Sequence, residues 1–444
     1  MNLENKIKNY EEEMIETLKK LVSYESILDE NNENYPFGKK IDDCLKNTLN
    51  IFEKLGFETY YGNGYYGYAE IGSGDELIGI LGHLDVVPAG DINNWNSPPF
   101  ELTEKNGNLY GRGSVDDKGP IVSALYAVKA LMDSNLKFNK RIRFIFGVDE
   151  ENLWRSIDKY LKNEEKPDMG FTPDSSFPMI HAEKGLLQFK LTSDTASSIK
   201  LKGGNAFNAV PDKIIYKSNK ADLIAENLDK LDYEYHKEND KITVLGKGAH
   251  ASKPYEGKNA ITRLTEALVQ SNIKNESLQF INEIIANDHH GKNIFGDCSD
   301  KPSGKLTINL GKIALNDQKQ ELSFDIRIPV TKNKEKIVNK IKKIAKEYNL
   351  KYEEYDYLDS LYVPKDHFLI KTLSKVYKEE TKLDPSPLTS GGATYARAIE
   401  NCVAFGPVFP GQKKIEHQAN EYIKTDSLIK CAKIYSKAIY ELSK

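Results

Sequence analysis

Histidine and acidic side chains gather in five short clusters of the sequence, and these residue types bind metal ions and move protons. The clusters are His83-Leu84-Asp85, Asp116-Asp117, Asp149-Glu150-Glu151, Asp174 and His417. They fall at the ends of expected strands or in loops, where open α/β sheets place their ligand sites. A single histidine or aspartate in a loop is usually a solvated turn residue. The prediction of a metal site therefore rests on the whole set.

Two of the clusters indicate how such a site would work. His83 and Asp85 follow an apolar strand and are two residues apart, so both side chains point the same way if the strand continues. We expect His83 to bind a metal ion while Asp85 sets its tautomer. Glu150 and Glu151 are adjacent and diverge, so one can bind a metal while the other acts on water. Imidazole and carboxylate donors without a thiolate suit zinc, cobalt or manganese.

The elements that must position these clusters alternate between strand and helix. The first 56 residues predict two amphipathic helices. Strands are expected at 77–81, 108–112 and 141–148, and helices at 120–132 and 153–161. This alternation predicts an α/β domain with a mixed, mostly parallel sheet and helices on both of its faces.

The pattern changes after residue 185. Alternating segments such as ELSFDIRI, with helices near 258–271 and 333–348, predict a separate α+β domain at 186–363. From 364 to 444 a helix, the glycine-rich loop SGGATYAR, a short strand and a terminal helix follow. We predict that 1–185 and 364–444 form one catalytic domain with the middle segment inserted.

Composition excludes several classes of protein. At 444 residues the chain is too long for one ordinary core. The net charge is -4 without a basic block, which argues against nucleic acid as a partner. No apolar run approaches the ~20 residues that span a membrane, and the N-terminus lacks the apolar stretch of a secretory signal. The four cysteines are far apart, which predicts neither disulfides nor thiolate zinc and favours the cytoplasm.

Five motifs occur in an order that resembles the M20 metallopeptidase family over nearly the whole chain. They are GHLDVVPAGD, GRGSVDDKGP, VDEENLW, FTPDSSFP and HQANE. Within the family the chain is most similar to the bacterial peptidase V (dipeptidase) branch, because it contains DDKGP, DEENLWRSIDKYL, PDSSFP and AEKG.

The resemblance implies two divalent metal ions per chain, zinc first, with manganese or cobalt as alternatives. Five ligands are implied, with His83 and Asp174 on the first ion, Glu151 and His417 on the second, and Asp116 on both. Glu150 would be the general base, and Asp85 would orient His83. The family's cis peptide bond after the bridging aspartate is expected at Asp116–Asp117.

The inserted domain would be a substrate-binding lid. His250 resembles the family's lid histidine, which polarises the scissile carbonyl, and Asn208 and Arg327 resemble residues that hold the substrate, Arg327 by its carboxylate. Ser390, Gly391 and Gly392 resemble the backbone cradle for that carboxylate. By composition alone, His250 is a turn histidine and Arg327 an ordinary strand arginine.

The implied reaction is hydrolysis of dipeptides that have a free N-terminal amine. Two cations would lower the pKa of a shared water, and Glu150 would take its proton and pass it to the leaving amine. Deacylation or desuccinylation of N-acyl amino acids, and tripeptidase or carboxypeptidase activity, are alternatives at the same centre. A catalytically inactive binding protein is disfavoured, because all five expected ligands and Glu150 are present. The expected partner is a small peptide, and the chain is expected to be a monomer or a lid-mediated homodimer.

Overall fold

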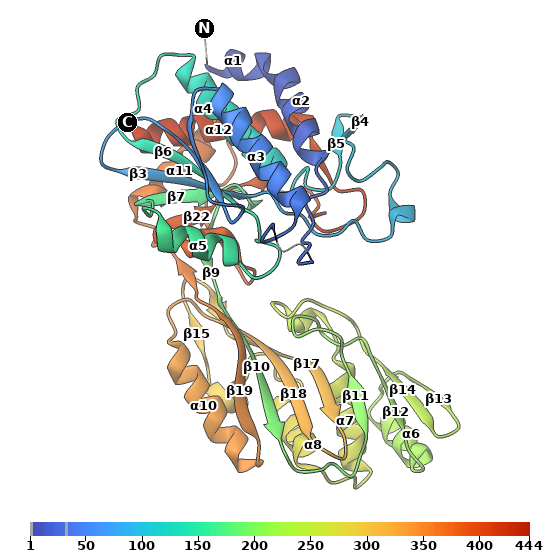
Figure 1. The fold of residues 1–444 in the computed structure, drawn as a ribbon. Helices are drawn as coiled ribbons and strands as arrows, with labels where there is room; N and C mark the ends of the chain where they lie inside the picture. The colour runs from blue at the N-terminus through green and yellow to red at the C-terminus, as the bar shows by residue number, and fades with distance from the viewer. Residues whose placement is uncertain (1–2, 32–33) are drawn as a thin grey trace. The chain divides into compact units, whose positions relative to one another are not determined.

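A computed structural model describes residues 3–31 and 34–444, which divide into two compact units (Figure 1). Unit 1 comprises Met1–His181, Tyr362–Leu388 and Thr394–Lys444, and unit 2 comprises Ala182–Leu361 and Thr389–Ala393. The segment Thr389–Ala393 lies within the predicted C-terminal part of the catalytic domain. It groups with unit 2 because Lys184 N donates to Ser390 O at 3.0 Å and Arg327 Nη1 to Gly391 O at 2.6 Å. The assignment of the units as catalytic domain and lid stays a prediction.

Unit 1 is built around one mixed sheet. Its strands run in the order β1 (Glu58–Tyr61), β2 (Gly67–Ile71), β6 (Arg141–Gly147), β3 (Leu77–His83), β7 (Met169–Thr172), β22 (Cys402–Ala404), β9 (Ile180–Glu183) and β20 (Leu361–Tyr362), with β21 (Leu388–Ser390) also on β9. The four strands β6, β3, β7 and β22 are parallel to one another, and the flanking strands β2 and β9 pair antiparallel with them. β3 is buried along its whole length, as a parallel strand covered on both faces must be.

Helices cover both faces of this sheet, as predicted. On β6, Phe144 and Phe146 contact Phe52 of α3 (Lys39–Lys54) with ring centroids 4.9 Å apart. Arg143 points to the opposite face and donates to the hydroxyl of Tyr160 in α5 (Arg155–Asn163) at 3.1 Å. The other helices of unit 1 are α1 (Leu3–Asn9), α2 (Glu11–Val22), α4 (Lys118–Met132), α11 (Phe368–Thr381) and α12 (Thr425–Ser443). No helix of residues 3–31 and 34–444 has the length and apolar character to cross a membrane.

Two expectations about unit 1 were wrong. Of the first 56 residues, the described ones (3–31 and 34–56) form three helices, because the chain turns at Tyr10 between α1 and α2. The strand expected at 108–112 is the shorter β5 (Asn108–Tyr110), which lies outside the main sheet. It pairs with β4 (Thr103–Lys105) and β24 (Tyr422–Lys424). Gly111 N makes the last ladder bond, to Glu421 O at 3.0 Å, whereas Arg112 N donates to Pro99 O at 2.7 Å. The chain therefore leaves the strand at this point and continues as a loop towards Asp116.

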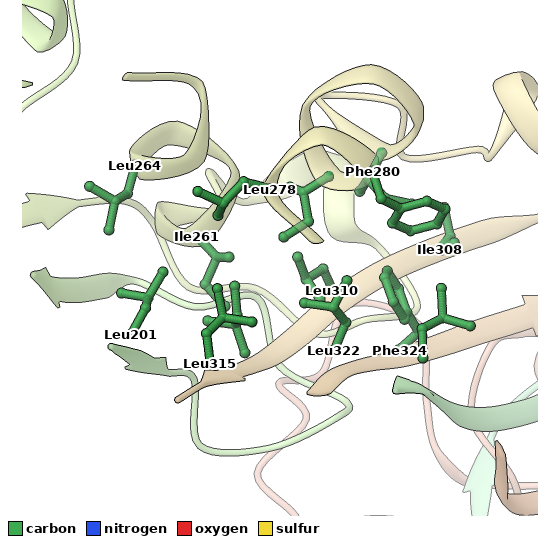
Figure 2. Close-up of a cluster of buried hydrophobic side chains, with 14 of the residues drawn as sticks. Leu201, Ile261, Leu264, Leu278, Phe280, Ile308, Leu310, Leu315, Leu322 and Phe324 are labelled. Carbon is green, nitrogen blue, oxygen red and sulfur yellow. The ribbon is translucent and has the colours of Figure 1, made fainter. Parts of the chain in front are cut away.

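Unit 2 contains an antiparallel sheet with helices packed on it, which agrees with the predicted α+β class. The strand order is β11 (Leu201–Gly203), β17 (Thr307–Leu315), β18 (Gln320–Ile328), β10 (Gly185–Ser193) and β19 (Lys351–Leu358). Figure 2 shows Leu310, Leu322 and Phe324 of the sheet packed beneath Ile261 of α7 and Phe280 of α8. The helices are α6 (Ala221–Lys230), α7 (Ala260–Gln270), α8 (Glu276–Phe280), α9 (Lys292–Phe295) and α10 (Lys334–Glu347). The unit also contains a small sheet of β12 (Lys213–Lys217), β14 (Lys241–Leu245) and β13 (Tyr235–Glu238), and a two-stranded sheet of β15 (Ser299–Asp300) and β16 (Gly304–Lys305).

Candidate metal centre

Three of the five clusters meet at the carboxyl edge of the parallel strands. His83 is the last residue of β3 and pairs in register with Gly147, the last residue of β6. Glu150 and Glu151 follow β6, and Asp174 follows β7. Strands that run parallel and side by side deliver the residues after their ends to one place. The fold therefore brings these side chains together without any special local structure.

The other two clusters arrive from loops. Asp116 lies just before α4, and the Asp116–Asp117 peptide bond is cis, as expected. His417 lies between β23 (Pro407–Val408) and β24 with a left-handed backbone at φ 65°. The pairing of β24 with β5 brings the segment after His417 beside the segment before Asp116. Residues about three hundred positions apart in the chain are thus joined at one site.

The side chains form two groups that share Asp116. Asp116 Oδ1 lies 2.8 Å from His83 Nε2, and Asp174 Oδ2 lies 3.8 Å from the same nitrogen. Asp116 Oδ2 lies 3.1 Å from His417 Nε2, which is also 3.0 Å from Glu151 Oε2. The two oxygens of one carboxylate therefore face two different imidazoles. This is the arrangement that the resemblance implied, although the ligand roles themselves stay a prediction.

Asp85 contributes in a way that the sequence did not predict. His83 Nδ1 lies 2.9 Å from the main-chain oxygen of Asp85, whereas the nearest carboxylate oxygen of Asp85 is 3.6 Å away. A carbonyl only accepts, so Nδ1 carries a proton. Nε2 faces the Asp116 carboxylate, to which it donates in the metal-free protein, and it is the nitrogen that a metal ion would bind after displacing that proton. The Asp85 carboxylate instead accepts from the main-chain N–H groups of Glu150 and Glu151, each at 3.1 Å. Asp85 thus fixes the histidine by its main chain and the two glutamates by its side chain.

The charges of the cluster do not balance. Four carboxylates, of Asp116, Glu150, Glu151 and Asp174, surround two imidazoles, and within the described residues none of the four pairs with a lysine or arginine. Burial and the neighbouring Asp116 raise the pKa of Asp174 to about 8. Burial, with Asp174 and Glu151 nearby, raises the pKa of Glu150 well above its ordinary value. Unpaired buried anions are costly.

Divalent cations fit this surplus of negative charge. Side-chain nitrogen and oxygen atoms of His83, Asp116 and Glu151 lie within 4.8 Å of one another, and so do those of His83, Glu150 and Asp174. Glu150 is thus close enough to be a ligand, although the resemblance assigns it as the base. Hydrogen bonds with Asp116 and Glu151 raise the pKa of His417 to about 11, so a metal ion must displace its proton.

An ion pair that the sequence did not predict supports Asp116. Arg112 Nη1 donates to Glu421 Oε2 at 2.6 Å, and both side chains are buried. Glu421 Oε1 accepts from the main-chain N–H groups of Val115 at 3.0 Å and Asp116 at 3.3 Å. Glu421 is the last residue of HQANE and Arg112 the second of GRGSVDDKGP, so both lie in motifs that were recognised without a role for them. Asp149, by contrast, is turned away and binds Arg155 at 2.8 and 2.9 Å.

The predicted substrate-binding residues lie in unit 2. Arg327 is buried, with Asp325 at 2.7 and 2.9 Å and the main-chain oxygen of Gly391 at 2.6 Å. Asp325 was missed, although its position two residues before Arg327 on one strand places both on the same face. Ser390 Oγ accepts from Gly392 N at 2.9 Å.

The loops that carry Asn208 and His250 pair with each other in unit 2. Ala251 N donates to Asn208 O at 2.9 Å, and Ala209 and His250 pair with each other as in an antiparallel sheet. The structure thus brings the two predicted lid loops together. Their roles in substrate binding stay predictions.

Comparisons with known proteins agree on one family. The family described as "Peptidase family M20/M25/M40" matches residues 79–441. A protein of Bacillus subtilis (strain 168), the candidate dipeptidase YtjP, is 36% identical over 468 aligned positions that cover 100% of both chains. Among solved structures, the dipeptidase Dug1p from Saccharomyces cerevisiae aligns with a TM-score of 0.62 at 14% identity, covering 99% of this chain and 98% of that one. Human carnosine dipeptidase 1 gives 0.61 at 15% identity with the same coverage. These structural likenesses concern the fold.

Proposed function

Because the chain belongs to peptidase family M20/M25/M40, we propose that it is a metal-dependent dipeptidase that hydrolyses dipeptides with a free N-terminal amine. The observation that carries the proposal is the sharing of Asp116 between two histidines, one in each group of acidic residues. The name of the relative YtjP supports dipeptides as the substrate class.

The proposed centre holds two divalent ions, zinc first and manganese or cobalt as alternatives. His83, Asp174 and Asp116 would hold one ion, and Glu151, His417 and Asp116 the other. When bound, such ions polarise a carbonyl group and acidify water. The donors are nitrogen and oxygen without sulfur, a set that all three metals accept.

Glu150 would carry the proton in this reaction. Its carboxylate would accept a proton from the attacking water and deliver it to the nitrogen of the leaving amine. The main-chain N–H of Glu150 donates to the Asp85 carboxylate at 3.1 Å, which fixes the position of the main chain that bears the Glu150 side chain. His250 would donate a hydrogen bond to the scissile carbonyl oxygen. Asn208, Arg327, Ser390, Gly391 and Gly392 would bind the rest of the substrate.

A substrate panel tests the proposal. The protein is loaded separately with Zn²⁺, Mn²⁺ or Co²⁺ and offered dipeptides, their N-acetylated forms, tripeptides and N-acyl amino acids. We expect metal-dependent cleavage of dipeptides and loss of activity when the amine is acetylated. Cleavage restricted to N-acyl amino acids or tripeptides would replace the dipeptidase assignment, and no cleavage with any metal would refute it. Mass spectrometry under native conditions gives the number of bound ions, for which we expect two per chain.

A further inference from the structure

The imidazole of His250 is held by a main-chain group of its own loop. Ser252 N donates to His250 Nδ1 at 3.1 Å, and Ser252 Oγ lies 2.8 Å from the same nitrogen. A backbone N–H group can only donate, so Nδ1 must accept and has no proton in the neutral ring. The serine hydroxyl then also donates to Nδ1. The ring proton is therefore on Nε2.

The loop that carries this contact is itself anchored. Asn309 on β17 donates from Nδ2 to the main-chain oxygens of Phe207 at 2.9 Å and Ala209 at 3.0 Å. The segment around Ala209 pairs with His250, and Lys253 N closes the turn on His250 O at 2.9 Å. The main chain before Ser252 is thus tied to the sheet of unit 2, and the turn after Ser252 closes on His250.

The side chain of Ser252 packs against Gly391. A Cβ atom at position 391 would lie 2.6 Å from Ser252 Cβ, so only glycine leaves room for the serine in this position. Gly391 is in turn fixed by Arg327, which donates to its main-chain oxygen at 2.6 Å. Arg327 donates two hydrogen bonds to the carboxylate of Asp325. These contacts form a continuous series from the buried ion pair to the imidazole.

We propose that Ser252 is a positioning residue that keeps His250 in its Nε2–H tautomer, and that Gly391, tied to Arg327, holds Ser252 in place. This deepens the proposed function and rests on it in one respect, since an Nε2–H group is the donor that a substrate carbonyl oxygen requires. Burial and the nearby positive charge of Arg327 lower the pKa of His250, so the ring is neutral near pH 7 and its tautomer matters. Arg327 and Gly391, predicted as substrate-binding residues, thereby gain a second role inside the protein.

The tautomer is measured directly and without substrate or metal. The chain has eight histidines, and all of them are labelled with ¹⁵N. The signals of His250 are identified as those that disappear from the spectrum of the His250→Gln variant. Long-range ¹H–¹⁵N spectra then distinguish a protonated Nε2 from a protonated Nδ1. We expect the Nε2–H form in the unaltered protein. A predominant Nδ1–H form would overturn the proposal.

Three variants test the positioning role. Ser252→Ala keeps the main-chain donor and loses the hydroxyl, so the Nδ1–H fraction should rise modestly, with a kcat for dipeptides lower by about five- to tenfold and little change in KM. Gly391→Ala pushes Ser252 away and should mix the two tautomers. Ser218→Ala removes an exposed serine hydroxyl of unit 2 that accepts from Lys220 N, and should change neither measurement.

The outcomes separate the two proposals. If neither Ser252→Ala nor Gly391→Ala alters the tautomer ratio, the positioning role is wrong whatever the activity. If Gly391→Ala fails to fold, Ser252→Ala alone decides. If the unaltered protein cleaves no dipeptide with any metal, the dipeptidase assignment fails while the measured tautomer still stands.

Discussion

Replacing Asp85 with asparagine tests the role of a carboxylate that binds two main-chain N–H groups. One oxygen accepts from Glu150 N and the other from Glu151 N, each at 3.1 Å. Asparagine keeps one acceptor and turns an N–H₂ group towards the other donor, so one charge-assisted hydrogen bond is lost. Such a bond contributes about 1.5–3 kcal/mol. Because Asp85 is 1% exposed, water does not replace the lost acceptor.

The loss of this hydrogen bond in Asp85→Asn should appear mainly as a lower kcat. If all of this free energy is lost from the placement of the two glutamates, about 1.5–3 kcal/mol corresponds to a fall in kcat of roughly 10- to 150-fold. The hydrogen bond from His83 goes to the main-chain oxygen of Asp85 and survives, so the ion on the His83 side should remain bound. Steady-state kinetics with a dipeptide and metal analysis of the same preparation measure both effects.

A control uses an exposed aspartate that accepts from one main-chain N–H group at the other end of β3. Asp168 Oδ2 accepts from Leu77 N at 2.8 Å. Asp168→Asn removes a charge but keeps an oxygen that can accept from Leu77 N, so the melting temperature should change little and kcat should stay within about twofold. The reasoning about Asp85 is refuted if Asp85→Asn keeps full kcat, or if it loses both ions together with its activity.

Three further outcomes are expected. Glu150→Gln should keep both ions and lower kcat by about 10²–10⁴-fold, as expected for loss of a general base; a fully active variant would show that the base is another group. Glu421→Gln leaves the buried Arg112 without a counter-charge, so a denaturant titration should show a free energy of unfolding lower by about 3 kcal/mol. The same variant should bind metal ions more weakly, because Asp116 N loses its acceptor. Metal affinity should fall as pH falls, because His417 (pKa about 11) and Asp174 (pKa about 8) hold protons in the metal-free protein that the ions must displace. Calorimetric titration in two buffers of different ionisation enthalpy counts the released protons, and a release of zero would contradict this.

The sequence by itself determined the class of the fold and the candidate ligands. Short-range periodicity identified the buried strand before His83 and the strand before Glu150, and parallel strands necessarily gather the residues at their ends. The order of the motifs then supplied Asp116, Asp174 and His417. Their identification needed no distances, since the chemistry of imidazole and carboxylate is a property of the residues themselves.

Only the tertiary structure decided which groups support these side chains. The pair of Arg112 and Glu421 joins residues 309 positions apart, and no local pattern encodes such a partner. Asp85 was expected to orient His83 with its carboxylate, yet the turn after β3 presents its carbonyl oxygen instead. Arg327 lies on an alternating strand as expected, but its hydrogen bond to Gly391 depends on a segment that returns to unit 2 after about sixty residues. Hydrogen-bond partners of this kind are set by where distant segments pack, and packing is the information that a local reading of the chain does not contain.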